Sequence, residues 1–358
     1  MTFSEIPVVD VSAALDGHGA DHGFATMFTD LCHEVGFVVA TDHGVPTELM
    51  HQVFTMMHDF FALPTSDKER IAKANSPQFR GWEPVGAETT DNAPDIREQI
   101  DVWTPWPQTP RTPPPDPVYQ RLLGPNQWLP DSVLAQHETL STAWIEALSS
   151  LADSLMASLS IGLGLPADHL RNLFGDQPMS LAKFIRYPPT PAGGAGVNPH
   201  HDAGFLTVLA PGPTPGLQVQ NQQGAWIDVP IIEDSFVINL GEILQSMTGN
   251  YLVATPHRVI TTAERYSAGY FHGPSLTTPL TRLPLSPQYA AAVEASPHHH
   301  DAGFMPTPEE AFAGTAAMAS EHRPSTYGEQ LWNYFTRSYH DHMVTHHSDV
   351  VSEQIRKF

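Results

Sequence analysis

The segment "NPHHDAGFLTVL" (198–209) places two potential metal ligands, His200 and Asp202, two positions apart. In an extended strand, side chains at i and i+2 share a face, so these two converge while His201 points away. Further along, the β-like run "LVATPHRVITT" contains His257. Two histidines and one carboxylate on a β scaffold predict a facial triad with open coordination positions. That triad suits non-haem Fe(II), although the same ligands also accept Zn²⁺ or Mn²⁺.

A candidate anion clamp follows the third ligand, in "RYSAGYFHGP" (265–274). Arg265 and Ser267 are again two positions apart and therefore share a strand face. A guanidinium fork beside a hydroxyl group suits a carboxylate. An arginine on a strand is usually a surface residue. The position of Arg265 just after His257 nevertheless favours a side chain that faces inward.

The hexapeptide "HHDAGF" occurs a second time, within "SPHHHDAGFMPT" (296–307). This copy precedes "MPTPEEAF", a loop-to-helix pattern, and the sequence offers no matching third ligand after it. We interpret it as a solvated His-rich loop, with a lid element or an adventitious metal site as the alternatives. Substitution of His200 by Ala is expected to abolish activity, whereas His300→Ala should leave Fe(II) binding intact.

Composition limits the classes of function. The chain has 358 residues, 41% of them apolar, and a formal net charge of −22, which disfavours nucleic acid and anionic membranes as partners. No apolar run is long enough for a membrane span, and the N-terminus "MTFSEIPVVD" lacks the pattern of a signal peptide. A single cysteine, Cys32, suits a reducing compartment, so a cytoplasmic location is expected.

The pattern along the chain predicts a mainly β protein with flanking helices. Apolar spacing predicts helices over 22–35, 47–62 and 132–161, and a closing helix over 326–343. After residue 178, short β-like runs separated by turn residues are typical of a sandwich or barrel. We expect one structural unit, divided into an N-terminal helix and strand region (1–120), a helix plus the β core (121–285), an insertion or lid loop (286–325), and a C-terminal helix and tail (326–358).

The order "PHHDAGFLTVL", "VATPHRVITT", "RYSAGYFHGP" resembles the Fe(II)- and 2-oxoglutarate-dependent oxygenases, in the branch related to isopenicillin N synthase. The segments "IPVVDVS", "GFVVATDHGVP", "FRGWEPVG" and "RYPPT" resemble that branch too. The resemblance implies a distorted double-stranded β-helix, or jelly roll, framed by helices. It also implies that His200, Asp202 and His257 bind Fe(II), and that Arg265 and Ser267 hold the far carboxylate of 2-oxoglutarate.

The same resemblance suggests further site residues. Tyr187 matches a tyrosine that touches the cosubstrate, and Lys183 lies on its strand face, where the bacterial ethylene-forming enzyme has a basic residue that helps to bind 2-oxoglutarate. The tail "YGEQLWNYFTRSYHDHM" (327–343) is also similar to that enzyme. By this likeness Arg337 would contact a substrate carboxylate, and Glu88 lies near an acid that recognises a guanidinium group. Phe271 and Arg80 complete the candidate substrate-binding residues.

Two departures from the ethylene-forming enzyme affect the expected substrate. Ala203 stands where that relative has an aromatic residue, and the segment 286–325 is longer. Hydroxylation or desaturation of a small metabolite is therefore expected, with an amino acid or its derivative left open. The cosubstrates would be 2-oxoglutarate and O₂, with release of succinate and CO₂. The alternatives are an oxidase like isopenicillin N synthase that uses no 2-oxoglutarate, ethylene formation, and a catalytically silent jelly roll. The oligomeric state is left open.

Overall fold

The computed structural model describes residues 3–15, 21–90, 93–106, 116–175, 177–190, 194–296, 299 and 324–350. Its centre is an eight-stranded sheet in which most neighbouring strands are antiparallel and only β1 and β2 are recorded as a parallel pair. In spatial order the strands are β1 (Val8–Asp10), β2 (Phe37–Thr41), β12 (Phe236–Leu240), β9 (Leu206–Ala210), β14 (Arg265–His272), β7 (Leu181–Tyr187), β6 (Glu98–Trp103) and β3 (Gly81–Glu83).

A second, four-stranded antiparallel sheet faces the first across an apolar layer. Its order is β11 (Trp226–Asp228), β10 (Leu217–Gln220), β13 (His257–Ile260) and β8 (Ala195–His200). Inward-facing side chains of both sheets form one buried cluster, to which Val197, Val219 and Val259 contribute from the small sheet and Ile185 and Val237 from the large one. This is the mainly β, jelly-roll architecture with flanking helices that the sequence predicts.

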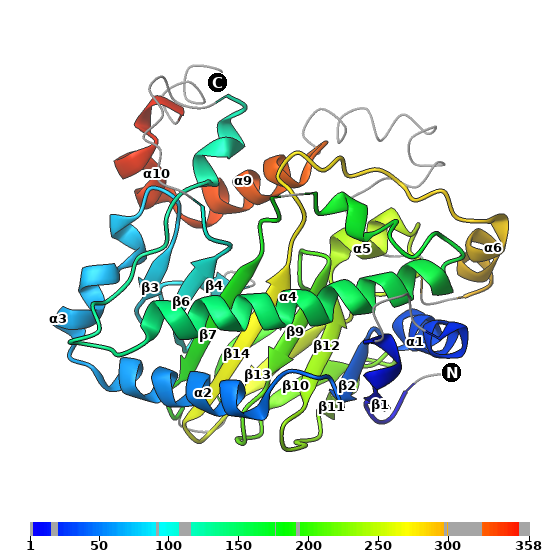
Figure 1. Cartoon of the computed structure of the whole chain (residues 1–358), viewed down its shortest axis with the longest axis horizontal. Helices are drawn as coiled ribbons and strands as arrows, with labels where there is room; N and C mark the ends of the chain where they lie inside the picture. The colour runs from blue at the N-terminus through cyan, green and yellow to red at the C-terminus, as the bar shows by residue number, and fades with distance from the viewer. Residues whose placement is uncertain are drawn as a thin grey trace.

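Three helices cover the outer face of the large sheet: α1 (His22–Glu34), α2 (Thr47–Ala62) and α4 (His137–Gly162). Figure 1 shows α4 running across β7, β14, β9 and β12. Apolar side chains of these helices join those of the sheet in a second, larger core. The helix predicted over 132–161 begins later, at His137, because Gln136 has a positive φ of 59° that breaks the helical path.

The C-terminal region contains α6 (Pro287–Ala295), α9 (Tyr327–Ser338) and α10 (His340–His346). The expectation of a loop over 286–325 is wrong at its start, since α6 begins with a proline in its first turn and is anchored by Tyr289, which donates to the Gly162 carbonyl at 3.0 Å. The helix predicted over 326–343 is divided at Tyr339, whose backbone (φ −130°, ψ 58°) is not helical.

The second "HHDAGF" copy lies largely outside the described residues, including His300 and the stretch 301–307. His299 is described, and it is 7% exposed. Its ring stacks on His33 at 4.3 Å between centroids, and its Nε2 lies 2.9 Å from the His33 carbonyl oxygen. The prediction of a solvated loop is therefore wrong for this residue, because packing against α1 removes it from water.

Shorter elements connect these layers: α3 (Thr65–Lys68), α5 (Glu242–Met247), a two-stranded hairpin of β4 (Thr89–Thr90) and β5 (Ala93–Pro94), and 3₁₀ turns at Ser12–Ala14, Glu69–Ile71, Lys73–Asn75, Val118–Leu122 and Arg171–Leu173. Within the part of the chain that the structure describes, no helix has the length and apolar character needed to cross a membrane.

Candidate active site

The three predicted metal ligands come together between β8 and β13. His200 ends β8, His257 begins β13, and the two residues pair directly in the antiparallel register. Asp202 follows two residues after β8, and its Oδ1 lies 3.8 Å from His200 Nε2 and 3.6 Å from His257 Nε2. One ligand atom from each residue lies within 4.8 Å of the others. The close spacing of His200 and Asp202 in the chain and the pairing of β8 with the distant β13 thus bring the three ligands into one cluster.

Hydrogen bonds fix the orientation of each ligand. His200 Nδ1 lies 2.8 Å from the Asn198 carbonyl oxygen and His257 Nδ1 lies 3.2 Å from that of Thr255. A carbonyl can only accept, so each Nδ1 carries the proton and each Nε2 lone pair faces the cluster. Asp202 Oδ2 accepts from Asn239 Nδ2 at 2.7 Å and from the Thr207 hydroxyl at 2.5 Å. Oδ1 is therefore the oxygen available to a metal.

The protonation states also suit a metal. Burial, with a smaller contribution from His257, lowers the pKa of His200 to about 3, so its imidazole is neutral at neutral pH. Burial alone would raise the pKa of Asp202, but His257 and His200 outweigh it and the pKa is lowered. Two imidazoles and one carboxylate form the donor set of a non-haem Fe(II) site, and the three residues fit that ion.

The predicted anion clamp lies at the paired ends of β14 and β7. Arg265 pairs with Tyr187 in the sheet register, and its guanidinium carbon lies 4.9 Å from the centre of the Tyr187 ring. Arg265 and Ser267 are each 1% exposed. Among the described residues, Arg265 Nε and Nη1 and Ser267 Oγ have no hydrogen-bond partner. Buried donors rarely lack partners, so these atoms fit the carboxylate of a bound cosubstrate.

A cavity of about 300 Å³ opens beside the triad. Its lining includes His200 and Asp202, strand residues of β6 and β7, and one face of α9. Predicted residues Glu88, Lys183 and Phe271 line it, together with Ala203 next to the metal ligand. The small side chain of Ala203 leaves space beside Asp202, which is consistent with a substrate approaching the metal from this side.

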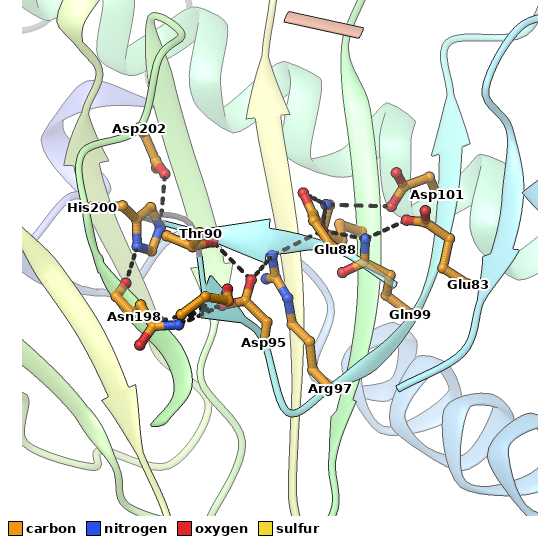
Figure 2. A network of polar contacts seen from close by, with 12 residues as sticks. Glu83, Glu88, Thr90, Asp95, Arg97, Gln99, Asp101, Asn198, His200 and Asp202 are labelled. Atoms are coloured by element: carbon orange, nitrogen blue, oxygen red, sulfur yellow. Dashed lines mark hydrogen bonds and ion pairs between the residues drawn. The ribbon is translucent and has the colours of Figure 1, made fainter. Parts of the chain in front are cut away.

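Glu88 and Lys183 are paired with each other rather than free. Lys183 Nζ lies 3.0 Å from Glu88 Oε2, and Arg97 donates to the same oxygen at 2.9 Å. Burial would raise the pKa of Glu88, but Lys183, Arg97 and Lys73 together hold it well below its usual range. Figure 2 shows this group of side chains continuing through Asp95 to Asn198 and His200.

Two predicted residues lie apart from this cluster. Arg80 is fully buried, donates to the Leu122 carbonyl at 3.1 Å and does not line the cavity. Arg337 is exposed on α9, donates from Nε to the Asn333 carbonyl at 3.1 Å, and is not among the residues that line the cavity. Arg337 comes three residues after Tyr334, so it lies beside the cavity face of α9, but its guanidinium is turned toward the Asn333 carbonyl.

Sequence reasoning missed several residues of the cavity wall, above all Asp101, Arg97 and Trp103. A signal was present in "EQIDVW" (98–103), a short β-like run that contains two acids. All six residues of this strand are buried. Charged residues are almost never buried without a partner, so acids within an apolar strand indicate a polar site or an ion pair.

Comparison with known families identifies the class of protein. A family model described as the N-terminal part of non-haem dioxygenases in morphine synthesis matches residues 6–131, and one for the 2OG-Fe(II) oxygenase superfamily matches residues 175–274. The 2-oxoglutarate-dependent dioxygenase frbJ of Dothideomycetidae sp. is 33% identical over 77% of this chain and 76% of its own. This chain belongs to the 2-oxoglutarate- and Fe(II)-dependent oxygenases.

Other relatives agree on the class. The 2-oxoglutarate-dependent dioxygenase caaD of Aspergillus niger is 34% identical over 76% of this chain and 86% of its own. The homoarginine-6-hydroxylase 2-ODD-233 of rice is 28% identical over 75% and 86%. The protein is thus a 2-oxoglutarate-dependent dioxygenase, and an oxidase that uses no 2-oxoglutarate is not favoured.

Solved structures share the fold. A full-length Neurospora crassa protein crystallised in complex with alpha-KG superposes with a TM-score of 0.67 at 23% identity, over 78% of this chain and 88% of that one. The dioxygenase for auxin oxidation in rice has a TM-score of 0.60 at 21% identity, over 91% and 98%.

Proposed function

We propose that His200, Asp202 and His257 hold Fe(II), and that Arg265 and Ser267 bind the far carboxylate of 2-oxoglutarate while the enzyme oxidises a C–H bond of a small metabolite. The observation that carries this assignment is the set of unpartnered donors of Arg265 and Ser267, buried in the same fold as an intact triad. O₂ would be the oxidant: bound Fe(II) would activate it, and 2-oxoglutarate would supply two of the four electrons that O₂ takes up, leaving as succinate and CO₂, while the substrate C–H bond would supply the other two.

The protein's own residues position the reactants. The Asn198 and Thr255 carbonyls keep the two imidazoles turned toward the metal, and Asn239 keeps Asp202 Oδ1 directed at it. Tyr187 packs against the Arg265 guanidinium, which limits the directions in which its donors point. The cavity wall of α9 and β6 then excludes water and holds the substrate near Ala203.

The relatives that are homoarginine hydroxylases support an amino acid or amine-bearing substrate. We place this substrate in the cavity beside the triad, with Phe271 against its apolar part and the polar wall of Glu88 and Lys183 near its charged part. In this arrangement Lys183 forms part of the substrate pocket rather than of the 2-oxoglutarate site, because it already pairs with Glu88.

The decisive test compares the wild type with His257→Ala for Fe(II) binding and for succinate release. Loss of one of three ligands should abolish both, because two ligands hold the metal too weakly. The exposed His51, which pairs with Asp234 on the surface, offers a matched control, and His51→Ala should keep full activity. Oxygen consumption measured with and without 2-oxoglutarate completes the test. Succinate release that survives in His257→Ala, or oxygen consumption that ignores 2-oxoglutarate, would overturn the proposal.

A further inference from the structure

We infer that Asp101 receives a cationic group on the side chain of the substrate, so that the enzyme selects a small molecule with a side-chain guanidinium or ammonium group. This inference rests on the proposed function and specifies the substrate class of the same cavity. It assigns to Asp101 the role that the family resemblance suggested for Glu88. Three observations carry it: a surplus of buried acid, an unpartnered oxygen on Asp101, and the saturation of Glu88.

Seven largely buried charges form an alternating chain, part of which Figure 2 shows, and the four in its middle line the cavity. The chain runs in the order Glu83, Lys73, Asp101, Lys183, Glu88, Arg97 and Asp95. The N–O distances between consecutive members are 2.5, 2.6, 3.7, 3.0, 2.9 and 3.1 Å. An acid stands at each end. Four carboxylates against three cations leave one negative charge without a cation of its own.

Lys73 stays protonated within this chain of charges. Burial alone would lower the pKa of Lys73, but the carboxylates of Asp101 and Glu83 outweigh it and raise the pKa. The metal centre would not neutralise the surplus: the charges of Fe(II), Asp202, 2-oxoglutarate and Arg265 sum to zero. An uncompensated buried charge is costly, so a bound cation would stabilise this wall.

The unpaired acceptor is on Asp101. Its Oδ2 takes a hydrogen bond from Lys73 at 2.6 Å, whereas its Oδ1 lies 3.7 Å from Lys183 Nζ and has no hydrogen-bond partner among the described residues. The side chain is only 4% exposed, yet Asp101 lines the cavity. A guanidinium or ammonium N–H of a ligand would supply the missing donor.

Glu88 is less suited to this task, because both its oxygens are fully used. Lys183 and Tyr334 donate to Oε1, and Lys183, Arg97 and Gln99 donate to Oε2. A carboxylate offers about four lone-pair positions, so a further donor would have to displace one of these.

A second unpartnered group lies beside Asp101. Trp103 follows two residues later on β6 and lines the same cavity, and its indole Nε1 has no partner among the residues that the structure describes. The wall thus presents an open acceptor and an open donor on one strand face. A polar ligand that carries both a cation and an acceptor, as an amino acid with a basic side chain does, would satisfy both.

The test uses near-isosteric pairs of amino acids that differ in side-chain charge: L-homoarginine against L-homocitrulline, and L-lysine against 6-hydroxy-L-norleucine. Binding is measured by calorimetry on the full-length protein loaded with Mn(II) and 2-oxoglutarate without oxygen, and succinate release is measured separately with Fe(II). We expect at least one charged compound to bind about tenfold or more tightly than its neutral partner and to stimulate succinate release.

Asp101→Asn should weaken the binding of the compound with the charged side chain by about tenfold or more, and should reduce the difference in affinity between it and its neutral partner. The substitution keeps the shape, and Lys73 retains Glu83 as a partner at 2.5 Å. Glu98→Gln is the matched control: Glu98 is a buried, ion-paired acid of the same strand, bound to Lys68 and Arg186 away from the cavity. This variant should leave binding within about twofold.

Equal binding of charged and neutral partners, binding of none of the four compounds, or unchanged affinity in Asp101→Asn would each overturn the inference. If Asp101→Asn fails to fold, the charge preference of the wild type still decides. The proposed function fails separately, through absence of any 2-oxoglutarate turnover in the wild type. Succinate release that proceeds with no preference for cations would leave the proposed function standing and reject Asp101 as the receptor.

Discussion

At the scale of single residues, the Asp202 carboxylate divides its oxygens between two tasks. Oδ1 faces both ligand imidazoles, and Oδ2 is held by Asn239 and Thr207. The ligand itself could be predicted from its spacing to His200, because the strand period places both on one face. Its supporting residues could not, since Asn239 comes from β12, which reaches the site only through the pairing of β12 with β9.

Asn239→Ala is therefore expected to weaken Fe(II) affinity by about 10- to 100-fold, because the carboxylate loses a hydrogen bond that orients it. Fe(II) titration of the metal-free protein measures the affinity, and thermal unfolding of the same sample shows whether the fold is retained. A variant that folds normally and binds Fe(II) as tightly as the wild type would contradict a role for Asn239 in orienting Asp202.

At the scale of elements, β6 and α9 determine the shape of the substrate side of the site. Alternate residues of β6 face opposite ways, so Gln99, Asp101 and Trp103 form one row while Glu98 lies in the other. The sequence predicts α9 well, since its apolar spacing and its Thr326 cap are local features. The face that α9 presents to the cavity follows from packing of distant elements, which a local pattern does not contain. The substrate contact expected for Arg337 stays a prediction.

Tyr334 connects α9 to the charged wall, because its hydroxyl donates to Glu88 Oε1 at 2.9 Å. Tyr334→Phe should raise the apparent KM of the stimulating substrate on the order of fivefold, as expected for loss of ~1 kcal/mol of hydrogen bonding, with a smaller effect on kcat. Arg337→Ala, one helical turn beyond Tyr334 and outside the set of cavity-lining residues, should change the KM by less than about twofold. Steady-state succinate release measures both. The reverse ranking of the two variants would show that Arg337 reaches the substrate.

At the scale of the whole molecule, two apolar cores surround the site: one between the sheets and one beneath α1, α2 and α4. The sequence predicts the alternation of short strands and the long helix that build these cores. It does not predict that β2, β3 and β6 of the N-terminal region join the large sheet, because these pairings link residues far apart in the chain. The charged wall depends on that joining, since Asp101 meets Lys183 across β6 and β7.

Burial of neutral histidines should make the stability of the whole molecule depend on pH. Burial, assisted by His346, His347 and Lys73, lowers the pKa of His342 from 6.5 to about 4. Burial also lowers the pKa of His137 to about 4. Between about pH 4 and about pH 6.5, the unfolded chain binds more protons than the folded one. The contribution of these histidines to the free energy of unfolding is therefore fully present above about pH 6.5, and it is lost progressively as the pH falls toward 4.

The His342 ring stacks on Phe79 at 4.1 Å between centroids, so His342→Phe would retain an aromatic contact and remove the titration. We expect the Tm of the variant to fall less than that of the wild type when the pH is lowered from about 7 to about 5. Carboxylates and His137 titrate alike in both proteins, so the difference between the two Tm profiles isolates His342. Parallel profiles would show that His342 has the same pKa in the folded and unfolded chain, and that α10 does not hold it neutral.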